Sequence, residues 1–408
     1  MKKVIVIGGG AAGMAAAAEA AVVGANVILL ERNEKLGKKI YITGKGRCNV
    51  TNDCTQDEFL RSVVRNPRFC YSALAALSPQ QLMQRIEQFG TPLKVERGSR
   101  VFPQSDKSSD IIRALERSVR EAGAEIRLHT RVRGISVQEG AVCGVIADGE
   151  TLPCDAVILA AGGLSYPSTG STGDGLRMAA ELGHTVTSLR PALTPFNAEC
   201  VMLPQLQGLS LKNVALHARL GKKELFCEQG EMLFTHFGIS GPLVLKLSSV
   251  LDAEELSALE VYVDLKPALD EAELDARLIR DFARFHQRQL KNALTELLPM
   301  RMQEPVLVLS GVSPEKPAGL LTRAERTALV RALKHFSIRL TGLRDYTEAV
   351  ITRGGVSVKE INSSTMESKL IKGLYFAGEM IDIDAYTGGF NLQLAFSTGT
   401  LAGRAQAE

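Results

Sequence analysis

Three glycines near the start of the chain have the types and spacing that a bound dinucleotide requires. Gly8, Gly10 and Gly13 follow the apolar run Val4 to Ile7 and precede an alanine-rich stretch. Gly8 permits a tight turn, Gly10 lets backbone amides approach a pyrophosphate, and Gly13 lets a helix pack against a strand. The N-terminus of that helix faces the phosphates. This stretch predicts a dinucleotide-binding strand, turn and helix, and the alternative is a glycine-rich turn without a ligand.

An acidic residue stands where the second strand of such a unit would end. Asn26 to Leu30 is strand-like, and Glu31 follows it. A carboxylate about twenty residues beyond the glycines accepts hydrogen bonds from the hydroxyls of an adenosine ribose, whereas an arginine there would accommodate a 2′-phosphate. The glycine motif alone is a weak signal. Together with the strand, the helix and Glu31 it favours FAD or NAD over NADP.

A polar loop over residues 44–52 follows this unit. It holds two glycines, two basic residues and several short polar side chains, which is typical of a loop rather than a packed element. Beside a dinucleotide the loop would supply amides and cations to phosphates and donors to a ring; the alternative is a solvated surface loop. Cys48 and Cys54 could suggest a redox pair, but their spacing differs from that of flavin disulfide reductases, and we do not favour it.

Small residues end a second buried strand over 156–163, and a similar arrangement closes the chain. Ligands lie outside the carboxyl ends of parallel strands, where small residues permit close approach, although such residues also suit a plain strand-to-helix turn. Residues 373–379 read as a strand ending on Glu379, and Gly388 and Gly389 open a final helix. That helix N-terminus would stabilise negative charge on a reduced flavin ring. The first and last segments are therefore predicted to build one cofactor site.

The segments between these two regions have a different pattern. We expect mainly helices over 56–125, and we expect the strand-like pieces between residues 93 and 146 to form one small antiparallel sheet. From Arg190 onward prolines punctuate short strand-like pieces, and helical patterns follow over 270–298 and 322–335, separated by Val306 to Leu309. The predicted organisation is a first part of the cofactor domain over 1–190, an inserted domain over 191–343, and a second part over 344–408.

Composition narrows the class of protein. The chain has 408 residues, of which 45% are hydrophobic and 23% charged, and its net charge of +3 requires no anionic partner. We expect a small-molecule substrate, no nucleic acid, no membrane span and a cytoplasmic protein, since the first strand begins too early to leave room for a signal peptide. Seven cysteines without a C-x-x-C pair, and scattered histidines, argue against a disulfide framework and a metal site. The oligomeric state stays open.

One stripe of basic residues could still bind an anionic partner, although the net charge requires none. Five cationic residues recur three or four apart on a predicted helix, and acidic residues precede them directly. The usual role of such a stripe is a solvated face, and the alternative is a surface for RNA or another anionic partner. The residues are Arg277, Arg280, Arg284, Arg288 and Lys291.

With these residues assembled, the sequence resembles the BaiN/YhiN-type family of FAD-dependent oxidoreductases, which is distantly related in architecture to fumarate reductase flavoproteins. The resemblance spans nearly the whole chain. It implies an α/β fold with a Rossmann-like FAD-binding domain, non-covalent FAD, and an insert made of a β-barrel-like unit and a helical unit. The matching segments are GGGAAG at 8–13, GKGRCNVTN at 44–52, SYPSTGSTGDG at 165–175, FTHFGISGP at 234–242, GGVSVKEIN at 354–362, TMESK at 365–369, LYFAGE at 374–379 and YTGGFN at 386–391.

The resemblance also bears on activity. Members of the family include one linked to reduction of carbon–carbon double bonds in 3-oxo bile-acid intermediates, and others similar to aminoacetone or amine oxidases. We therefore expect an NAD(P)H-driven reductase of an activated C=C bond, with an amine oxidase and a flavin-dependent nucleic-acid-modifying protein as the alternatives. A protein acid would protonate the α-carbon while donors hold the carbonyl oxygen. The candidates for these roles are His236, Tyr166, Arg47 and Tyr386.

The predicted cofactor-binding residues come from five places in the chain: the glycine turn, the end of the second strand, the polar loop, the second strand end and the C-terminal segment. They are Gly8, Gly10, Ala11, Ala12, Gly13, Glu31, Arg32, Lys38, Gly46, Arg47, Cys48, Asn49, Val132, Ala161, Gly162, Gly163, Gly378, Glu379, Gly388, Gly389, Phe390 and Asn391.

Overall fold

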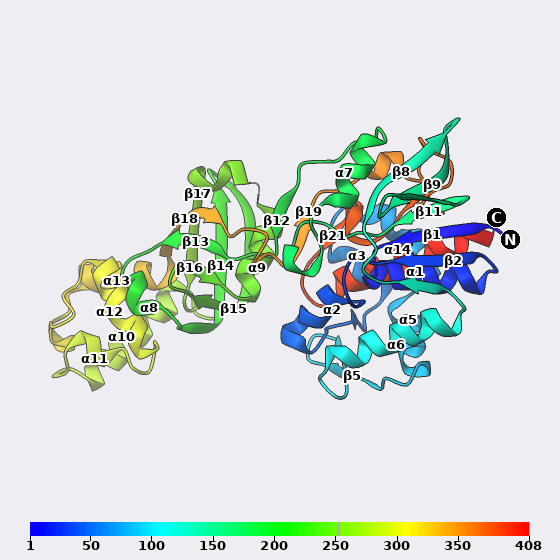
Figure 1. Cartoon of the computed structure of the whole chain (residues 1–408). Helices are drawn as coiled ribbons and strands as arrows, with labels where there is room; N and C mark the ends of the chain where they lie inside the picture. Colours follow the sequence, from blue (N-terminus) through cyan, green and yellow to red (C-terminus); the bar gives the residue numbers. More distant parts are fainter. Residues whose placement is uncertain (252, 408) are drawn as a thin grey trace. The chain divides into compact units, whose positions relative to one another are not determined.

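The chain folds into two compact units. The structure is a computed structural model that describes residues 1–251 and 253–407. One unit contains Met1–Ala192 together with Tyr346–Glu408, and the other contains Leu193–Asp345. Both ends of the chain therefore belong to the first unit, as Figure 1 shows. The predicted fold class, a Rossmann-like α/β domain with an inserted β-barrel and helical region, is confirmed.

A five-stranded parallel sheet forms the centre of the first unit. Its strand order is β20-β11-β1-β2-β7, and each neighbouring pair is parallel. Strands covered on both faces are continuously apolar, and β11 is buried at every position. The strands are β1 (Lys3–Ile7), β2 (Asn26–Leu30), β7 (Glu125–Arg127), β11 (Ala156–Leu159) and β20 (Leu374–Phe376).

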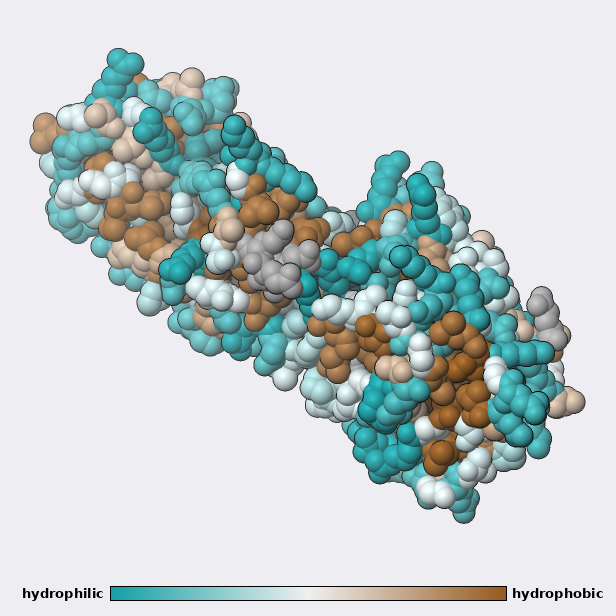
Figure 2. All heavy atoms as spheres, turned by 90° about the horizontal axis from the view of Figure 1, so that it is seen from above, coloured by the Kyte–Doolittle hydropathy of each residue, from teal (hydrophilic) through white to brown (hydrophobic). Residues whose placement is uncertain are grey.

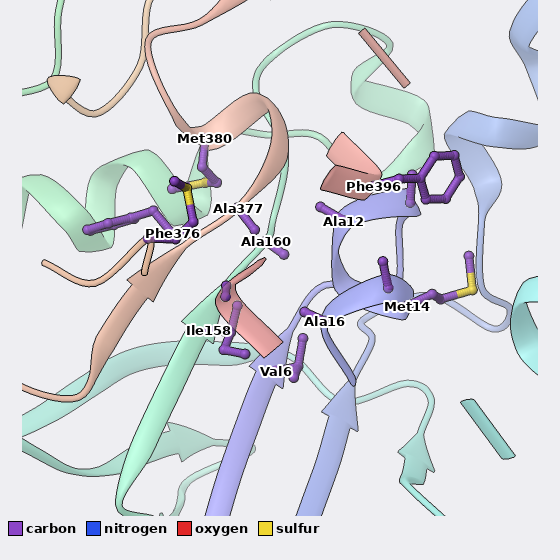
Figure 3. Packing of buried hydrophobic residues seen from close by; sticks show 14 of the residues in the cluster. Val6, Ala12, Met14, Ala16, Ile158, Ala160, Phe376, Ala377, Met380 and Phe396 are labelled. Carbon is purple, nitrogen blue, oxygen red and sulfur yellow. The ribbon is translucent and has the colours of Figure 1, made fainter. Parts of the chain in front are cut away.

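Small side chains let helix α1 (Ala11–Val22) lie close to this sheet. Val6 of β1 is in register with Ile158 of β11, and Ala16 of α1 lies beside them in Figure 3. The alanines of α1 lose no side-chain entropy on burial and favour the helix, so this segment combines helix propensity with close packing. The predicted order of strand, tight turn, helix and strand is confirmed.

The last helix of the chain, α14 (Phe390–Arg404), packs against α1 at backbone distance. A Cβ atom added at Gly399 would lie 2.2 Å from the carbonyl oxygen of Ala12, and one added at Gly403 would lie 2.5 Å from that of Ala16. Only glycine fits at these two positions. The contact joins the first and last segments of the chain around one core.

The smaller strands of the first unit correct one prediction. They do not form a single antiparallel sheet, because β7 follows helix α6 (Ser108–Glu121) and enters the main sheet parallel to β2. The others form two three-stranded sheets and two strand pairs: β3 (Thr51–Asn52), β6 (Arg100–Pro103) and β5 (Leu93–Glu96); β10 (Glu150–Pro153), β9 (Ala141–Ala147) and β8 (Val132–Gln138); β12 (Arg190–Ala192) with β19 (Ile351–Arg353); and β21 (Asp384–Ala385) with β4 (Val63–Arg65).

Shorter helices complete the first unit. Two of them begin with a capping box, in which the N-cap side chain and a side chain three residues on satisfy each other's backbone N–H groups. The helices are α2 (Lys38–Ile42), α3 (Gln56–Arg61), α4 (Tyr71–Ala76), α5 (Pro79–Gln88) and α7 (Asp174–Glu181).

The second unit contains a closed six-stranded barrel, in the order β13-β16-β15-β14-β17-β18. Closure leaves no free sheet edge. The apolar run Val306 to Leu309, which separates the predicted helices, is itself helical and lies in α12. The strands are β13 (Phe196–Glu199), β14 (Ser210–Leu220), β15 (Lys223–Phe234), β16 (Gly238–Ser240), β17 (Leu259–Asp264) and β18 (Phe336–Leu343). The helices are α8 (Leu203–Leu206), α9 (Pro242–Val250), α10 (Glu271–Arg284), α11 (Leu290–Ala293), α12 (Met300–Ser310) and α13 (Arg323–Lys334).

The surface carries hydrophilic residues with hydrophobic ones interspersed, as the face drawn in Figure 2 shows. Among the helices of the described chain, none has both the length and the apolar character that crossing a bilayer would take.

Replacing Gly399 by alanine tests the contact between α1 and α14. An alanine inside a helix normally stabilises it by about 1 kcal/mol relative to glycine. Here the added Cβ would meet the Ala12 carbonyl, so we expect the free energy of unfolding to fall by about 1–3 kcal/mol instead. Chemical denaturation measures it. Gly134→Ala is the matched control, because its Cβ would find its nearest neighbour at 3.7 Å; equal effects of the two changes would contradict the packing argument.

Candidate cofactor-binding site

A cavity of about 220 Å³ lies in the first unit, at the carboxyl ends of β1, β2 and β11. Its wall continues along the segment after β20 and the first turns of α14. Thirteen of the predicted cofactor-binding residues line it: Gly8, Gly10, Ala11, Ala12, Glu31, Arg32, Lys38, Val132, Ala161, Gly162, Gly378, Glu379 and Asn391. The tertiary structure therefore brings together segments from both ends of the chain.

The glycine turn has the geometry that a pyrophosphate needs. Gly8 has a φ of +106°, and a Cβ there would lie 2.6 Å from the Ala160 oxygen. A Cβ at Gly13 would lie 1.8 Å from the Gly8 oxygen, so helix and turn touch through backbone. Gly10 differs, because a Cβ there would meet no atom within 4 Å. Gly10 thus borders open space at the N-terminus of α1, where a phosphate group would bind.

The Glu31 carboxylate stabilises the glycine turn by accepting a hydrogen bond from its backbone. Its side chain is buried, and Oε2 accepts a hydrogen bond from the Gly9 amide at 2.7 Å. Oε1 accepts from the backbone and side-chain nitrogens of Asn33 at 2.8 and 2.7 Å. A carboxylate oxygen can accept more than one hydrogen bond, so Oε2 keeps capacity for a ribose hydroxyl. Glu31 both fixes the glycine turn and faces the cavity.

Cationic side chains line the wall beyond Glu31. Arg32 and Arg131 both contact Asp174, at 3.3 and 2.8 Å. Arg131 also has a buried Nε atom without a hydrogen-bond partner among the described residues. An orphaned buried donor beside a cavity fits a bound ligand with acceptor atoms, because burial without a partner is costly. Arg131 was missed by the sequence analysis, although it directly precedes the predicted Val132.

Glu379 forms an ion pair and lies in a 3-10 turn, Gly378–Met380, because β20 ends at Phe376 and not at Glu379 as predicted. Its Oε2 is 2.6 Å from Nζ of Lys39, and its Oε1 accepts from the Thr352 amide at 2.7 Å. Lys39 and the predicted Lys38 both line the cavity, while Lys38 also contacts Glu34 at 3.3 Å. The sequence analysis chose Lys38 alone, because nothing in the pattern of two successive lysines shows which one reaches Glu379.

Asparagine side chains fix the turn that precedes α14. Asn49, with its amide oxygen toward the turn, accepts from the Gly389 amide at 3.1 Å. Asn52 donates to the Gly388 oxygen at 3.0 Å, and Asn391 both accepts from the Ala385 amide at 2.9 Å and donates to its oxygen at 2.7 Å. Asn49 and Asn391, which were predicted, and Asn52, which was not, therefore position the helix N-terminus. Of them, Asn391 also lines the cavity.

The other predicted cofactor residues lie around the cavity rather than in its wall. Cys48 is fully buried, and burial raises the pKa of its thiol to about 12. It is a neutral packing residue at ordinary pH, which gives a physical reason against a redox role. A Cβ at Gly163 would meet Thr352 at 2.4 Å, so that glycine permits close packing. The residues outside the wall are Gly13, Gly46, Arg47, Cys48, Asn49, Gly163, Gly388, Gly389 and Phe390.

Arg47, a candidate for both cofactor binding and catalysis, is held by acids. Its Nε lies 2.8 Å from Asp106, its Nη2 contacts Glu96 at 2.5 Å, and its guanidinium stacks over Phe102 at 4.2 Å. The hydrogen bond to Glu96 is the largest cause of a raised pKa of Arg47, and the hydrogen bond to Asp106 is the next largest. Arg47 therefore braces the polar loop against β5 and β6.

The three remaining catalytic candidates lie on different segments. Tyr166 has a φ of +54°, and its amide donates to the Tyr346 oxygen at 2.8 Å. Burial, and then the charge of Glu348, raise the pKa of Tyr166, so its hydroxyl stays protonated. The Tyr386 amide donates to the Ser62 oxygen, and His236 follows β15 in the second unit. In the described chain, the cavity wall includes none of the four candidates.

Two acids that the sequence analysis missed, Asp174 and Asp384, lie in the cavity wall. Asp384 of β21 is 1% exposed, and its two carboxyl oxygens have no hydrogen-bond partner among the described residues. Burial raises its pKa to about 6 against the lowering effects of Arg353 and Arg65. The only sequence signal was an acid alternating with apolar residues, Ile381 to Asp384, shortly before the glycine pair.

A second group of polar residues lies on the barrel hairpin of β14 and β15. His217, Glu224 and Cys227 bring possible ligand atoms within 4.8 Å of one another. Glu224 contacts Nδ1 of His217 at 3.1 Å, whereas the Cys227 sulfur lies 4.0 Å from Nε2. Glu224 and Cys227 therefore contact different ring nitrogens of His217. Arg219 also contacts Glu224, at 3.4 Å, and the arrangement fits a surface polar cluster.

Replacing Gly10 by alanine separates cofactor binding from folding. The new methyl group meets no protein atom but occupies the space beside the helix N-terminus. We expect the apoprotein to keep its free energy of unfolding within about 0.5 kcal/mol, while FAD affinity falls at least about tenfold, or ~1.4 kcal/mol. Flavin fluorescence titration measures the affinity, with Gly134→Ala as the control. An apoprotein that unfolds more easily would show that Gly10 serves the fold instead.

Replacing Asp384 by asparagine tests the burial of its charge. The folded-state pKa of about 6 lies above the ordinary value of 3.8, so the folded apoprotein binds more protons than the unfolded chain between these values. Wild-type stability should therefore fall relative to Asp384→Asn as pH rises through this window, by roughly 2–3 kcal/mol in total. Denaturant unfolding at several pH values measures the difference. A difference that does not change with pH would show that the carboxyl is solvated.

Comparison with known proteins extends over the whole site. The model of the HI0933-like protein Rossmann domain matches residues 2–405. The chain is 32% identical over 387 residues to the 3-dehydro-bile acid delta(4,6)-reductase of Clostridium scindens, covering 94% of this chain and 93% of that protein. It is also 32% identical over 377 residues to the ribosomal RNA dihydrouridine synthase of Escherichia coli, covering 92% and 90%.

Solved flavoprotein structures share the fold at much lower identity. The 3-ketosteroid delta1-dehydrogenase of Sterolibacterium denitrificans aligns over all of both chains with a TM-score of 0.54 and 13% identity. The 3-ketosteroid-delta4-(5alpha)-dehydrogenase of Rhodococcus jostii aligns over 100% of this chain and 97% of its own, with a TM-score of 0.52 and 17% identity. The dinucleotide cradle, the cavity beside it and the family match together show that this chain belongs to the HI0933-like family of FAD-dependent oxidoreductases, as the resemblance to BaiN/YhiN-type proteins implied.

Proposed function

We propose that this protein is an NAD(P)H-driven reductase of a C=C bond conjugated to a carbonyl group, with an enone such as a 3-oxo bile-acid or steroid intermediate as substrate. The observation that carries the proposal is the FAD cradle in a chain that is 32% identical, over 94% of its length, to a protein named as a bile-acid delta(4,6)-reductase. A bound flavin supplies a hydride for the β-carbon of such a substrate.

The chain's own residues have three tasks in this reaction. The turn at Gly8 and Gly10 and the N-terminus of α1 bind the pyrophosphate, and Glu31 binds the ribose. The N-terminus of α14, fixed by Asn49 and Asn391, faces developing negative charge. The family motifs contain no second dinucleotide fingerprint, so NAD(P)H would visit the flavin transiently rather than occupy a Rossmann domain of its own.

The proton that completes the reduction would come from one of the four predicted groups. Tyr166 is a suitable donor, because its raised pKa keeps the hydroxyl protonated across neutral pH. Arg47 carries a permanent charge that can stabilise an oxyanion, but Glu96 and Asp106 already neutralise it. His236 and Tyr386 remain the other candidates for the acid and oxyanion roles.

A second candidate substrate is uridine in ribosomal RNA. Two relatives, from Escherichia coli and Haemophilus influenzae, are named ribosomal RNA dihydrouridine synthase, each at 32% identity. The uracil C5=C6 bond is conjugated to a carbonyl, so its saturation is the same reaction on a different substrate. The basic stripe gives this candidate little support, because Arg284 contacts Glu296 at 2.9 Å and Lys291 contacts Glu315 at 3.6 Å.

Anaerobic reduction of the holoprotein tests the electron donor. We expect NADH or NADPH to bleach the flavin absorbance near ~450 nm, and addition of a 3-oxo-delta-4 steroid to restore it as the flavin passes its electrons on. Gly10→Ala, with its reduced flavin content, is the control for signal from the cofactor. Bleaching by a small amine, with hydrogen peroxide on exposure to air and none by NAD(P)H, would instead identify an oxidase.

Competition between substrates then separates the enone from RNA. The NAD(P)H-reduced protein is offered the steroid enone, an unmodified ribosomal RNA transcript, or free uridine, and products are identified by a mass gain of two hydrogens. Conversion of the enone alone supports the first candidate. Conversion of the transcript alone, weakened by added salt as phosphate contacts are, would overturn the enone in favour of RNA.

A further inference from the structure

Asp384 lies in the cavity wall without a hydrogen-bond partner, and its Oδ1 forms a long ion pair with Nε of Arg65 at 4.0 Å. It stands in β21, which pairs with β4, and shares the wall with Asn391 and Leu392 in the first turn of α14. Asp384 is 1% exposed, and neither of its carboxyl oxygens accepts a hydrogen bond from a described residue. A buried carboxylate without hydrogen bonds is costly and favours its protonated form.

The charged groups around Asp384 lower its pKa by less than burial raises it. From β4, Arg65 makes a bidentate contact with Asp382 at 2.9 Å for each nitrogen, while its Nε lies 4.0 Å from Asp384. Arg353 of β19 lowers the pKa of Asp384, and the neighbouring charge of Asp382 raises it. The near side chain of α14, Asn391, is neutral and engaged by the backbone of Ala385. Burial is the largest effect, and the pKa lies at about 6.

The pKa of Asp384 is expected to respond to charge on the cofactor. Asp384 adjoins the α14 N-terminus, the end of the cavity where negative charge on a reduced ring is best stabilised. A second negative charge nearby disfavours an ionised carboxyl, so the pKa of Asp384 must rise when the flavin gains electrons. Asp174, which also lines the cavity, differs because Arg32 and Arg131 neutralise it.

We propose that Asp384 takes up one proton when the flavin bound in this cavity is reduced. The reductant supplies two electrons to the flavin, solvent supplies one proton to a carboxyl oxygen of Asp384, and the carboxylate becomes a neutral acid. Reoxidation returns that proton. The inference rests on flavin binding and not on the identity of the proposed substrate. Asp384 is thus a positioning and charge-balancing group of the flavin site.

The test is the pH dependence of the flavin midpoint potential in the holoprotein, measured by dye-coupled reduction. One additional proton for two electrons makes the potential fall about 30 mV more per pH unit, over the window between the pKa values of Asp384 in the oxidised and in the reduced holoprotein. We expect Asp384→Asn to lose this additional slope and Asp174→Asn to keep it. Equal slopes in the wild type and Asp384→Asn would overturn the proposal.

Infrared spectroscopy gives a second readout that needs no variant to retain flavin. The reduced-minus-oxidised difference spectrum of the wild type should show a new carboxylic-acid C=O band that shifts in deuterated water. If Asp384→Asn binds flavin, the band should be lost. A wild-type spectrum without a carboxylic-acid band at a pH inside the window would overturn the proposal, whatever the substrate and the electron donor prove to be.

Discussion

The backbone contact between α1 and α14 is the constraint on which the rest of the first unit depends. Gly399 and Gly403 let the last helix approach the carbonyls of Ala12 and Ala16, so residues nearly four hundred positions apart share one core. That contact places the N-termini of both helices on the same cavity. Both helix N-termini carry a partial positive charge, which favours anionic groups such as phosphates at this end of the cavity.

The cavity combines satisfied and unsatisfied polar groups, and the difference is informative. Glu31, Glu379 and Asp174 are held by amides or cations, so their geometry is set before any ligand arrives. Arg131 Nε and the Asp384 oxygens have no hydrogen-bond partner in the described structure. Burying a polar atom without a hydrogen-bond partner costs free energy. A bound ligand that supplies the missing hydrogen-bond partners best explains these atoms, and this agrees with the family's cofactor.

The relatives of this chain show why the fold and the chemistry must be argued separately. Proteins named as a bile-acid reductase and as ribosomal RNA dihydrouridine synthases are equally similar to it, at 32% identity. A shared FAD domain supports one kind of reaction on very different substrates. Which substrate is reduced depends on which molecule can reach the flavin ring. The glycine turn from Gly8 to Gly13 does not determine this.

The sequence by itself determined the elements whose signal is local. Apolar runs, the glycine turn and Glu31 predicted the first strand, helix and strand, and several of the residues that line the cavity on that side, because each depends on spacing within about thirty residues. Tertiary structure decided what depends on contacts between distant segments. It placed β7 in the main sheet, paired Lys39 rather than Lys38 with Glu379, paired Arg47 with Glu96 and Asp106, and buried Asp384 without a hydrogen-bond partner. No local pattern encodes these outcomes, because burial and pairing are set by the segment that packs opposite.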